Sequence, residues 1–279
     1  MANYRRHWGI ATSPFRCRLD ADGFFESLMH EEALARLDFL VEEQRRLGLL
    51  LGPSGSGKSL VLSVFAARMR SMGRIAPHFS LTGTTPEEFP ELLVGGLGMV
   101  LPRRCSMAAL WRRIEDRLAE FRYQQTAVVV LLDDADAARI DVFAQVTRLA
   151  KLDPRPDSRL TMVLAAQPQA LARMPTSLVE LADLRIDLDA WEPEETAQFI
   201  ETSLSKAGCT APVFGQSAIA RLHELSGGIP RKVSQLADLA LVAGAGRGLA
   251  SIDAETVESA CLELGAVALP DQPAAASLA

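Results

Sequence analysis

The chain has 279 residues and a formal net charge of −6, with 48% hydrophobic and 23% charged residues. This composition is ordinary for a globular protein long enough for two domains, and it gives no global attraction to nucleic acid or to anionic membranes. No window approaches the ~20 consecutive apolar residues of a membrane span, and the N-terminal MANYRRHWGI lacks the apolar stretch of a signal peptide. Four scattered cysteines are typical of free thiols in a reducing compartment. We therefore expect a cytoplasmic protein without direct membrane insertion.

Short apolar runs alternate with helical patterns through the first two thirds of the chain. Runs of this kind suit strands that are buried on both faces of a parallel sheet. The last run alternates apolar and polar residues, as an edge strand does. The pattern predicts an α/β fold with a parallel five-stranded sheet flanked by helices, its strands falling in residues 47–52, 78–81, 127–133, 160–166 and 184–190.

After Trp191 no strand pattern remains, and four helical patterns follow one another to about residue 265. The tail ALPDQPAAASLA has little apolar surface to bury. We therefore expect an α/β domain over residues 1–190, a small all-α lid domain over 191–265 and a disordered tail over 266–279.

The segment GPSGSGKS lies between the first apolar run and an apolar-periodic helix, and it matches the phosphate-loop (Walker A) pattern G-x-x-x-x-G-K-[ST]. In such a loop the backbone N–H groups surround the α- and β-phosphates, the lysine reaches the β- and γ-phosphates, and the last hydroxyl binds Mg²⁺. The following helix presents its N-terminus to the anion. The sequence therefore predicts ATP and Mg²⁺ as ligands, with Ser59 on the metal and the nucleotide contacted by Gly52, Pro53, Ser54, Gly55, Ser56, Gly57, Lys58, Ser59 and Leu60.

The run VVVLLDDADA ends in two aspartates. Asp133, at the end of a strand, is placed to hold Mg²⁺ through water. The next residue normally polarises the attacking water, and here it is Asp134, whose carboxylate lies roughly 1.5 Å further back than that of a glutamate. Misplacement of that size can cost ~100-fold in rate, so the pattern leaves open a working ATPase or a weak one. Asp136 is a fallback acid, with a solvated loop residue as the alternative.

Residues 103–122 are rich in arginine, which raises the alternative of a nucleic-acid patch. Acidic residues are interleaved with the arginines, and the apolar residues recur at helical spacing. This pattern favours an amphipathic helix with a solvated charged face.

With both motifs and the helical region in view, the chain resembles the AAA+ ATPases of the general secretion pathway protein A (ExeA/GspA) type, and similar modules serve certain transposases. Beyond the phosphate loop, the resemblance rests on WGIATSPF, on FFESLMHEEALARLDFLVEE before the loop, on VLAAQPQAL, and on SGGIPRKVSQLADLAL in the helical region. Longer members continue into a membrane helix and a peptidoglycan-binding part, and we expect a stand-alone ATPase module here.

The resemblance also implies roles for single residues. Gln167 falls at the sensor-1 position, where a polar side chain contacts the γ-phosphate or the attacking water, and Arg231 falls at the sensor-2 position of the lid. Arg185 is the candidate arginine finger for a neighbouring subunit, with Arg173 as its competitor. His30 corresponds to a histidine near the nucleotide, with a surface histidine as the alternative.

Together these features predict an ATP hydrolase in which Asp134, Gln167, Arg231 and Arg185 complete the catalytic site. We expect a homo-oligomer that uses ATP·Mg²⁺ to change conformation or to assemble on a protein partner. One alternative is an ATP-dependent DNA-binding regulator resembling the transposition ATPases. The other is a poorly hydrolysing, nucleotide-dependent scaffold.

Overall fold

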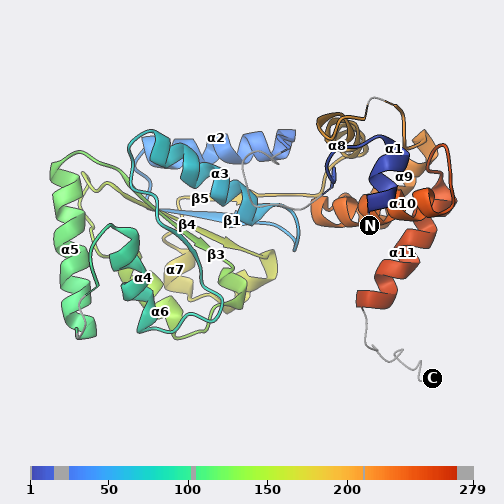
Figure 1. Ribbon diagram of the computed structural model, residues 1–279. Helices are drawn as coiled ribbons and strands as arrows, with labels where there is room; N and C mark the ends of the chain where they lie inside the picture. Colours follow the sequence, from blue (N-terminus) through green and yellow to red (C-terminus); the bar gives the residue numbers. More distant parts are fainter. Residues whose placement is uncertain (1, 16–24, 102–104, 210, 269–279) are drawn as a thin grey trace, which may run out of the picture. The chain divides into compact units, whose positions relative to one another are not determined.

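The computed structural model describes residues 2–15, 25–101, 105–209 and 211–268. Within these ranges the chain forms two compact units, one from Leu19–Asp189 and one from Met1–Arg18 together with Ala190–Ala279. The first is an α/β unit and the second is all-helical (Figure 1).

The α/β unit is built on a parallel five-stranded sheet in the order β2-β3-β4-β1-β5. The predicted parallel sheet is therefore confirmed, and the last strand lies at an edge as its alternating pattern indicated. The strands are β1 (Leu47–Leu51), β2 (His78–Ser80), β3 (Val128–Asp133), β4 (Leu160–Ala166) and β5 (Leu184–Asp187).

Helices cover both faces of this sheet (Figure 1). Because side chains alternate along a strand, Val128 and Val130 join one hydrophobic cluster while Val129 and Leu131 join the other. One face packs against α2 (Leu28–Glu42) and α3 (Lys58–Ser71). The opposite face packs against α4 (Glu88–Gly96), α5 (Met107–Tyr123), α6 (Val142–Ala150) and α7 (Thr176–Val179).

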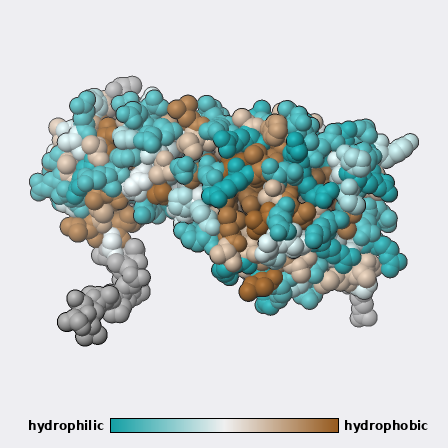
Figure 2. All heavy atoms as spheres, turned by 180° about the vertical axis from the view of Figure 1, so that it is seen from behind, coloured by the Kyte–Doolittle hydropathy of each residue, from teal (hydrophilic) through white to brown (hydrophobic). Residues whose placement is uncertain are grey.

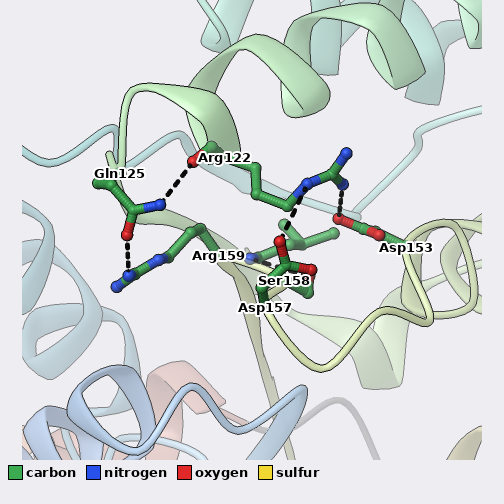
Figure 3. A network of polar contacts seen from close by, with 7 residues as sticks. Arg122, Gln125, Asp153, Asp157, Ser158 and Arg159 are labelled. Carbon is green, nitrogen blue, oxygen red and sulfur yellow. Dashed lines mark hydrogen bonds and ion pairs between the residues drawn. The ribbon is translucent and has the colours of Figure 1, made fainter.

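The arginine-rich helix is α5, and its apolar stripe is buried as the amphipathic pattern predicts. Its buried residues are Leu110, Trp111, Ile114, Leu118 and Phe121. The end of α5 also anchors the amino ends of β3 and β4 (Figure 3). Arg122 donates to Asp153 at 2.6 Å and lies 3.8 Å from Asp157, while Gln125 joins Arg159 to the carbonyl of Arg122. This polar network lies where β3 and β4 begin, and ligands of open parallel sheets bind at the opposite, carboxyl ends of the strands. We therefore interpret the network as a support for the fold.

The helical unit contains α8 (Pro193–Lys206), α9 (Gln216–Ser226), α10 (Pro230–Gly246) and α11 (Ala254–Ala268), the four helices that the sequence predicts. The expected disordered tail is corrected at its start, because residues 266–268 end α11. The rest of that tail lies outside the described residues.

The N-terminal segment differs from the expectation that residues 1–190 form one domain. Its helix α1 (Ala2–Trp8) packs on α10, where the indole N–H of Trp8 donates to the Leu241 carbonyl at 2.8 Å. The N–H of Ala11 donates to the Ala207 carbonyl at 2.8 Å, and the ring of Phe15 lies near two aromatic rings of the helical unit. WGIATSPF therefore belongs to the helical unit, and only a contact made across the length of the chain reveals it.

Figure 2 shows hydrophilic side chains over much of the surface seen from behind, with hydrophobic ones gathered over part of the α/β unit. In the ranges that the structure describes, no helix is long and apolar enough to cross a membrane.

Replacing Trp8 tests the placement of the N-terminal segment. We expect Trp8→Ala to destabilise the helical unit by about 3 to 5 kcal/mol, because it removes a buried aromatic side chain. Trp8→Phe keeps most of the buried area and should cost about 1 kcal/mol for the lost hydrogen bond. Amide hydrogen exchange should speed up in α10 of Trp8→Ala and stay unchanged in β3. Equal loss of protection in both elements would contradict this placement.

Candidate functional site

The phosphate loop connects β1 to α3, as the sequence predicts. Gly55 and Gly57 have φ values of 88° and 101°, in the left-handed region that favours glycine. The Lys58 ammonium donates to the carbonyls of Gly52 at 2.8 Å and Pro53 at 2.9 Å, so the lysine folds back across the loop. Ser59 follows at the start of α3, where the helix N-terminus favours a bound anion.

The loop is tied to two strands beside it. The N–H of Gly52 donates to the Ala166 carbonyl at the end of β4, at 3.2 Å. A Cβ atom at position 52 would lie 2.5 Å from Ser56 Oγ and 2.7 Å from the Leu188 carbonyl, so only glycine fits. The shape of the loop therefore depends on close backbone packing as well as on glycine's freedom.

His30 supports the loop from α2. Its Nε2–H donates to the Ser56 carbonyl at 3.1 Å, and its Nδ1 lies 3.1 Å from the hydroxyl of Ser27, the N-cap of that helix. A Cβ at Gly57 would lie 2.6 Å from His30 Nε2. The side chain is buried, which excludes the surface-histidine alternative. It contacts the backbone of the phosphate loop, and a direct contact with nucleotide stays a prediction.

Asp133 ends β3 and is buried, with 5% of its surface exposed. One carboxylate oxygen accepts the N–H of Asp134 at 2.9 Å, and the other lies 4.0 Å from His78 Nε2 on β2. Burial lowers the pKa of His78, and the nearby Asp133 carboxylate opposes that shift. Parallel strands bring their carboxyl ends to one edge of the sheet, so Asp133 lies at the same edge as the phosphate loop.

Asp134 adopts a left-handed conformation with φ 53° and ψ 40°, which is costly for a residue with a side chain. Its carboxylate accepts a hydrogen bond from the Ser80 hydroxyl of β2 at 2.7 Å. The sequence identified Asp134 but not its partner, because nothing in the order of the residues shows that β2 pairs with β3.

Gln167 follows β4 and begins the 3₁₀ helix η3 (Pro168–Arg173). Its side-chain amide donates to Asp136 at 2.9 Å, and its backbone N–H donates to the same carboxylate at 3.2 Å. Asp136, in the 3₁₀ helix η2 (Ala135–Ala137), is therefore not a solvated loop residue. Arg173 donates to the Asp136 carbonyl at 3.2 Å, which ties the competing finger candidate to the same turn.

Two arginines remain among the predicted site residues. Arg185 is on the edge strand β5, is exposed, and pairs with Asp187 at 2.8 Å. Arg231 is exposed in the first turn of α10, in the helical unit. Their roles as arginine finger and sensor 2 stay predictions.

A parallel sheet with a phosphate loop after its first strand and a buried aspartate at the end of its third is the arrangement of a P-loop nucleotide-binding domain. Residues 41–174 match the AAA domain family. Over 268 residues the chain is 26% identical to general secretion pathway protein A of Aeromonas hydrophila, covering 95% of this chain and 49% of that protein. The chain is therefore similar to AAA domains over residues 41–174, and it spans about half the length of the relative that it matches.

Solved structures share the fold at low sequence identity. Cdc6p of Pyrobaculum aerophilum is 16% identical with a TM-score of 0.67, covering 95% of this chain and 74% of that one. The Aeropyrum pernix Orc1 protein, solved in complex with DNA, is 20% identical with a TM-score of 0.64, covering 88% and 68%. The Thermotoga maritima RuvB Holliday junction branch migration motor is 14% identical with a TM-score of 0.56, covering 90% and 73%.

The close packing at Gly52 predicts a loss of ATP binding in Gly52→Ala. The added methyl group would displace Ser56 or Leu188 and distort the loop, and we expect affinity for ATP to fall about tenfold or more. Gly95→Ala is the control, because a Cβ there meets nothing within 4 Å. Titration calorimetry measures both variants, and equal affinities would show that the loop tolerates the methyl group.

The environment of His78 predicts a pH dependence of stability. The pKa of His78 is lowered in the folded protein from its ordinary 6.5, so the unfolded state takes up the proton first as pH falls. The free energy of unfolding should therefore fall as pH drops below about 6.5, and His78→Gln should lose that part of the slope. Urea denaturation between about pH 8 and pH 5 compares the two proteins, and parallel curves would contradict the prediction.

Proposed function

We propose that this chain binds ATP·Mg²⁺ at the phosphate loop and hydrolyses it, and that it uses the cycle to change conformation or to assemble on a protein partner. The observation that carries the proposal is the loop itself, held between β1 and α3 with the Lys58 ammonium folded across it. The match of residues 41–174 to the AAA domain family supports it.

The residues of the α/β unit fit such a ligand. Loop N–H groups and Lys58 would bind the phosphates, and Ser59 and Asp133 would hold the metal, Asp133 through water. Mg²⁺, when bound, neutralises charge on the β- and γ-phosphates. The buried carboxylate of Asp133 is suited to a cation, because a buried anion is costly unless a positive charge or hydrogen bonds compensate it.

Asp134 and Gln167 would position the attacking water. In the structure Asp134 is held by Ser80, so its carboxylate has a fixed direction despite being one methylene shorter than glutamate. Arg231 would report the nucleotide state to the helical unit, and Arg185 of a neighbouring copy would complete the site. A homo-oligomer follows from this last role, because an arginine supplied in trans requires a second subunit.

Steady-state hydrolysis across a protein concentration series tests the proposal. We expect wild-type turnover above that of Lys58→Ala, and a turnover per molecule that rises with concentration as subunits assemble. ATP binding that persists without turnover above Lys58→Ala would overturn hydrolysis and favour the nucleotide-dependent scaffold. ATP-dependent retention on duplex DNA that weakens steeply with salt would favour the DNA-binding regulator instead.

In the same assay, Asp134→Glu shows whether the shorter acid limits the rate. We expect this variant to be about tenfold faster or more, because its carboxylate reaches roughly 1.5 Å further toward the water. Equal or slower turnover would mean that the position set by Ser80 already suffices.

A further inference from the structure

Asp136 makes two hydrogen bonds to one residue. One carboxylate oxygen accepts the backbone N–H of Gln167 at 3.2 Å, and the other accepts the side-chain Nε2–H at 2.9 Å. Both residues are half-buried, and they join the turn after β3 to the end of β4. The backbone bond prevents the carboxylate from turning away from the side chain.

This pairing decides which way the Gln167 carboxamide faces. An ionised carboxylate is only an acceptor, so the nitrogen of the carboxamide must face Asp136 and its oxygen must point away. The direction of the amide therefore follows from chemistry, because the reversed carboxamide would bring two acceptors together.

Two further hydrogen bonds hold the turn that contains Asp136. The Arg173 guanidinium donates to the Asp136 carbonyl at 3.2 Å, and the N–H of Ala137 donates to the Asp134 carbonyl at 2.9 Å. The left-handed conformation of Asp134 begins this turn. A residue keeps such a strained backbone conformation only where the surrounding structure holds it. The hydrogen bonds to η2 hold Asp134 in this way.

We propose that Asp136 is a positioning residue that holds Gln167 with its carboxamide oxygen directed to accept a hydrogen bond from the attacking water. The inference rests on the proposed hydrolysis of ATP. An oxygen suits water, which donates, and it repels the oxygens of a γ-phosphate. Of the two contacts open to a residue at this position, the structure thus favours the water. Asp136 also joins Gln167 to the turn that carries Asp134, so both groups that orient the water share one support.

Asp136→Asn tests the direction of the carboxamide with almost no change in volume. The backbone N–H of Gln167 needs the single oxygen of the new side-chain amide, so the new NH₂ group faces the Gln167 side chain. The Gln167 carboxamide must then reverse and present nitrogen in place of oxygen to the water. We expect kcat to fall about 100-fold, with ATP affinity within about threefold of wild type and an unchanged midpoint of thermal unfolding.

A second substitution restores the acceptor. When Asp136→Asn is combined with Gln167→Glu, one oxygen of the new carboxylate accepts from the new amide and the other oxygen points outward. We expect this double variant to be at least about tenfold faster than Asp136→Asn. Gln167→Glu alone places two carboxylates together, and it should be slow because like charges repel. A purely structural role of Asp136 would not give this rescue.

NMR of the side-chain amide tests the hydrogen bond between Asp136 and Gln167 independently of ATP hydrolysis. The Gln167 N–H₂ resonances, assigned by their loss in Gln167→Glu, should shift clearly in Asp136→Asn because the bond to a charged acceptor is lost. No shift would overturn the inference, as would a double variant no faster than Asp136→Asn when both bind ATP and unfold like wild type. Wild-type turnover no higher than that of Lys58→Ala would refute the proposed hydrolysis, and the resonances would then decide the pairing alone.

Discussion

Burial of both faces of the parallel sheet is the constraint on which the other features depend. Strands β1, β3 and β4 are buried along their whole length, so their backbone groups must pair with one another. Parallel pairing then brings the ends of these strands to one edge. The phosphate loop, Asp133 and Gln167 lie at the same edge of the sheet because each is at the carboxyl end of one of these strands.

Hydrogen bonds between neighbouring strand ends then fix the side chains at this edge. Gly52 bonds to the end of β4, Ser80 of β2 bonds to Asp134, and Asp136 bonds to Gln167. Each contact crosses from one strand connection to the next. The side chains of Asp134 and Gln167 therefore keep defined directions, although the backbone around them is irregular. Electrostatic catalysis requires polar groups that are held in this way.

The polar side chains at the two ends of β3 and β4 differ in what they contact. Where β3 and β4 begin, Arg122 and its carboxylate partners hold the connections together around a half-buried ion pair. Where these strands end, the polar side chains gather around a loop suited to phosphate. The division follows from strand direction, because ligands of open parallel sheets bind outside the carboxyl ends of the strands.

The sequence by itself determined the five strands, the helices that follow Trp191 and the position of the phosphate loop. Apolar runs of strand length located all five strands, and the spacing of GPSGSGKS located the loop, because both signals are local. Tertiary structure alone decided that Trp8 packs in the helical unit and that His30 supports the loop. It also decided that Ser80 and Asp136 hold the groups beside the candidate site. These contacts depend on strand order and on packing between distant segments, and periodicity along a chain carries information about neither.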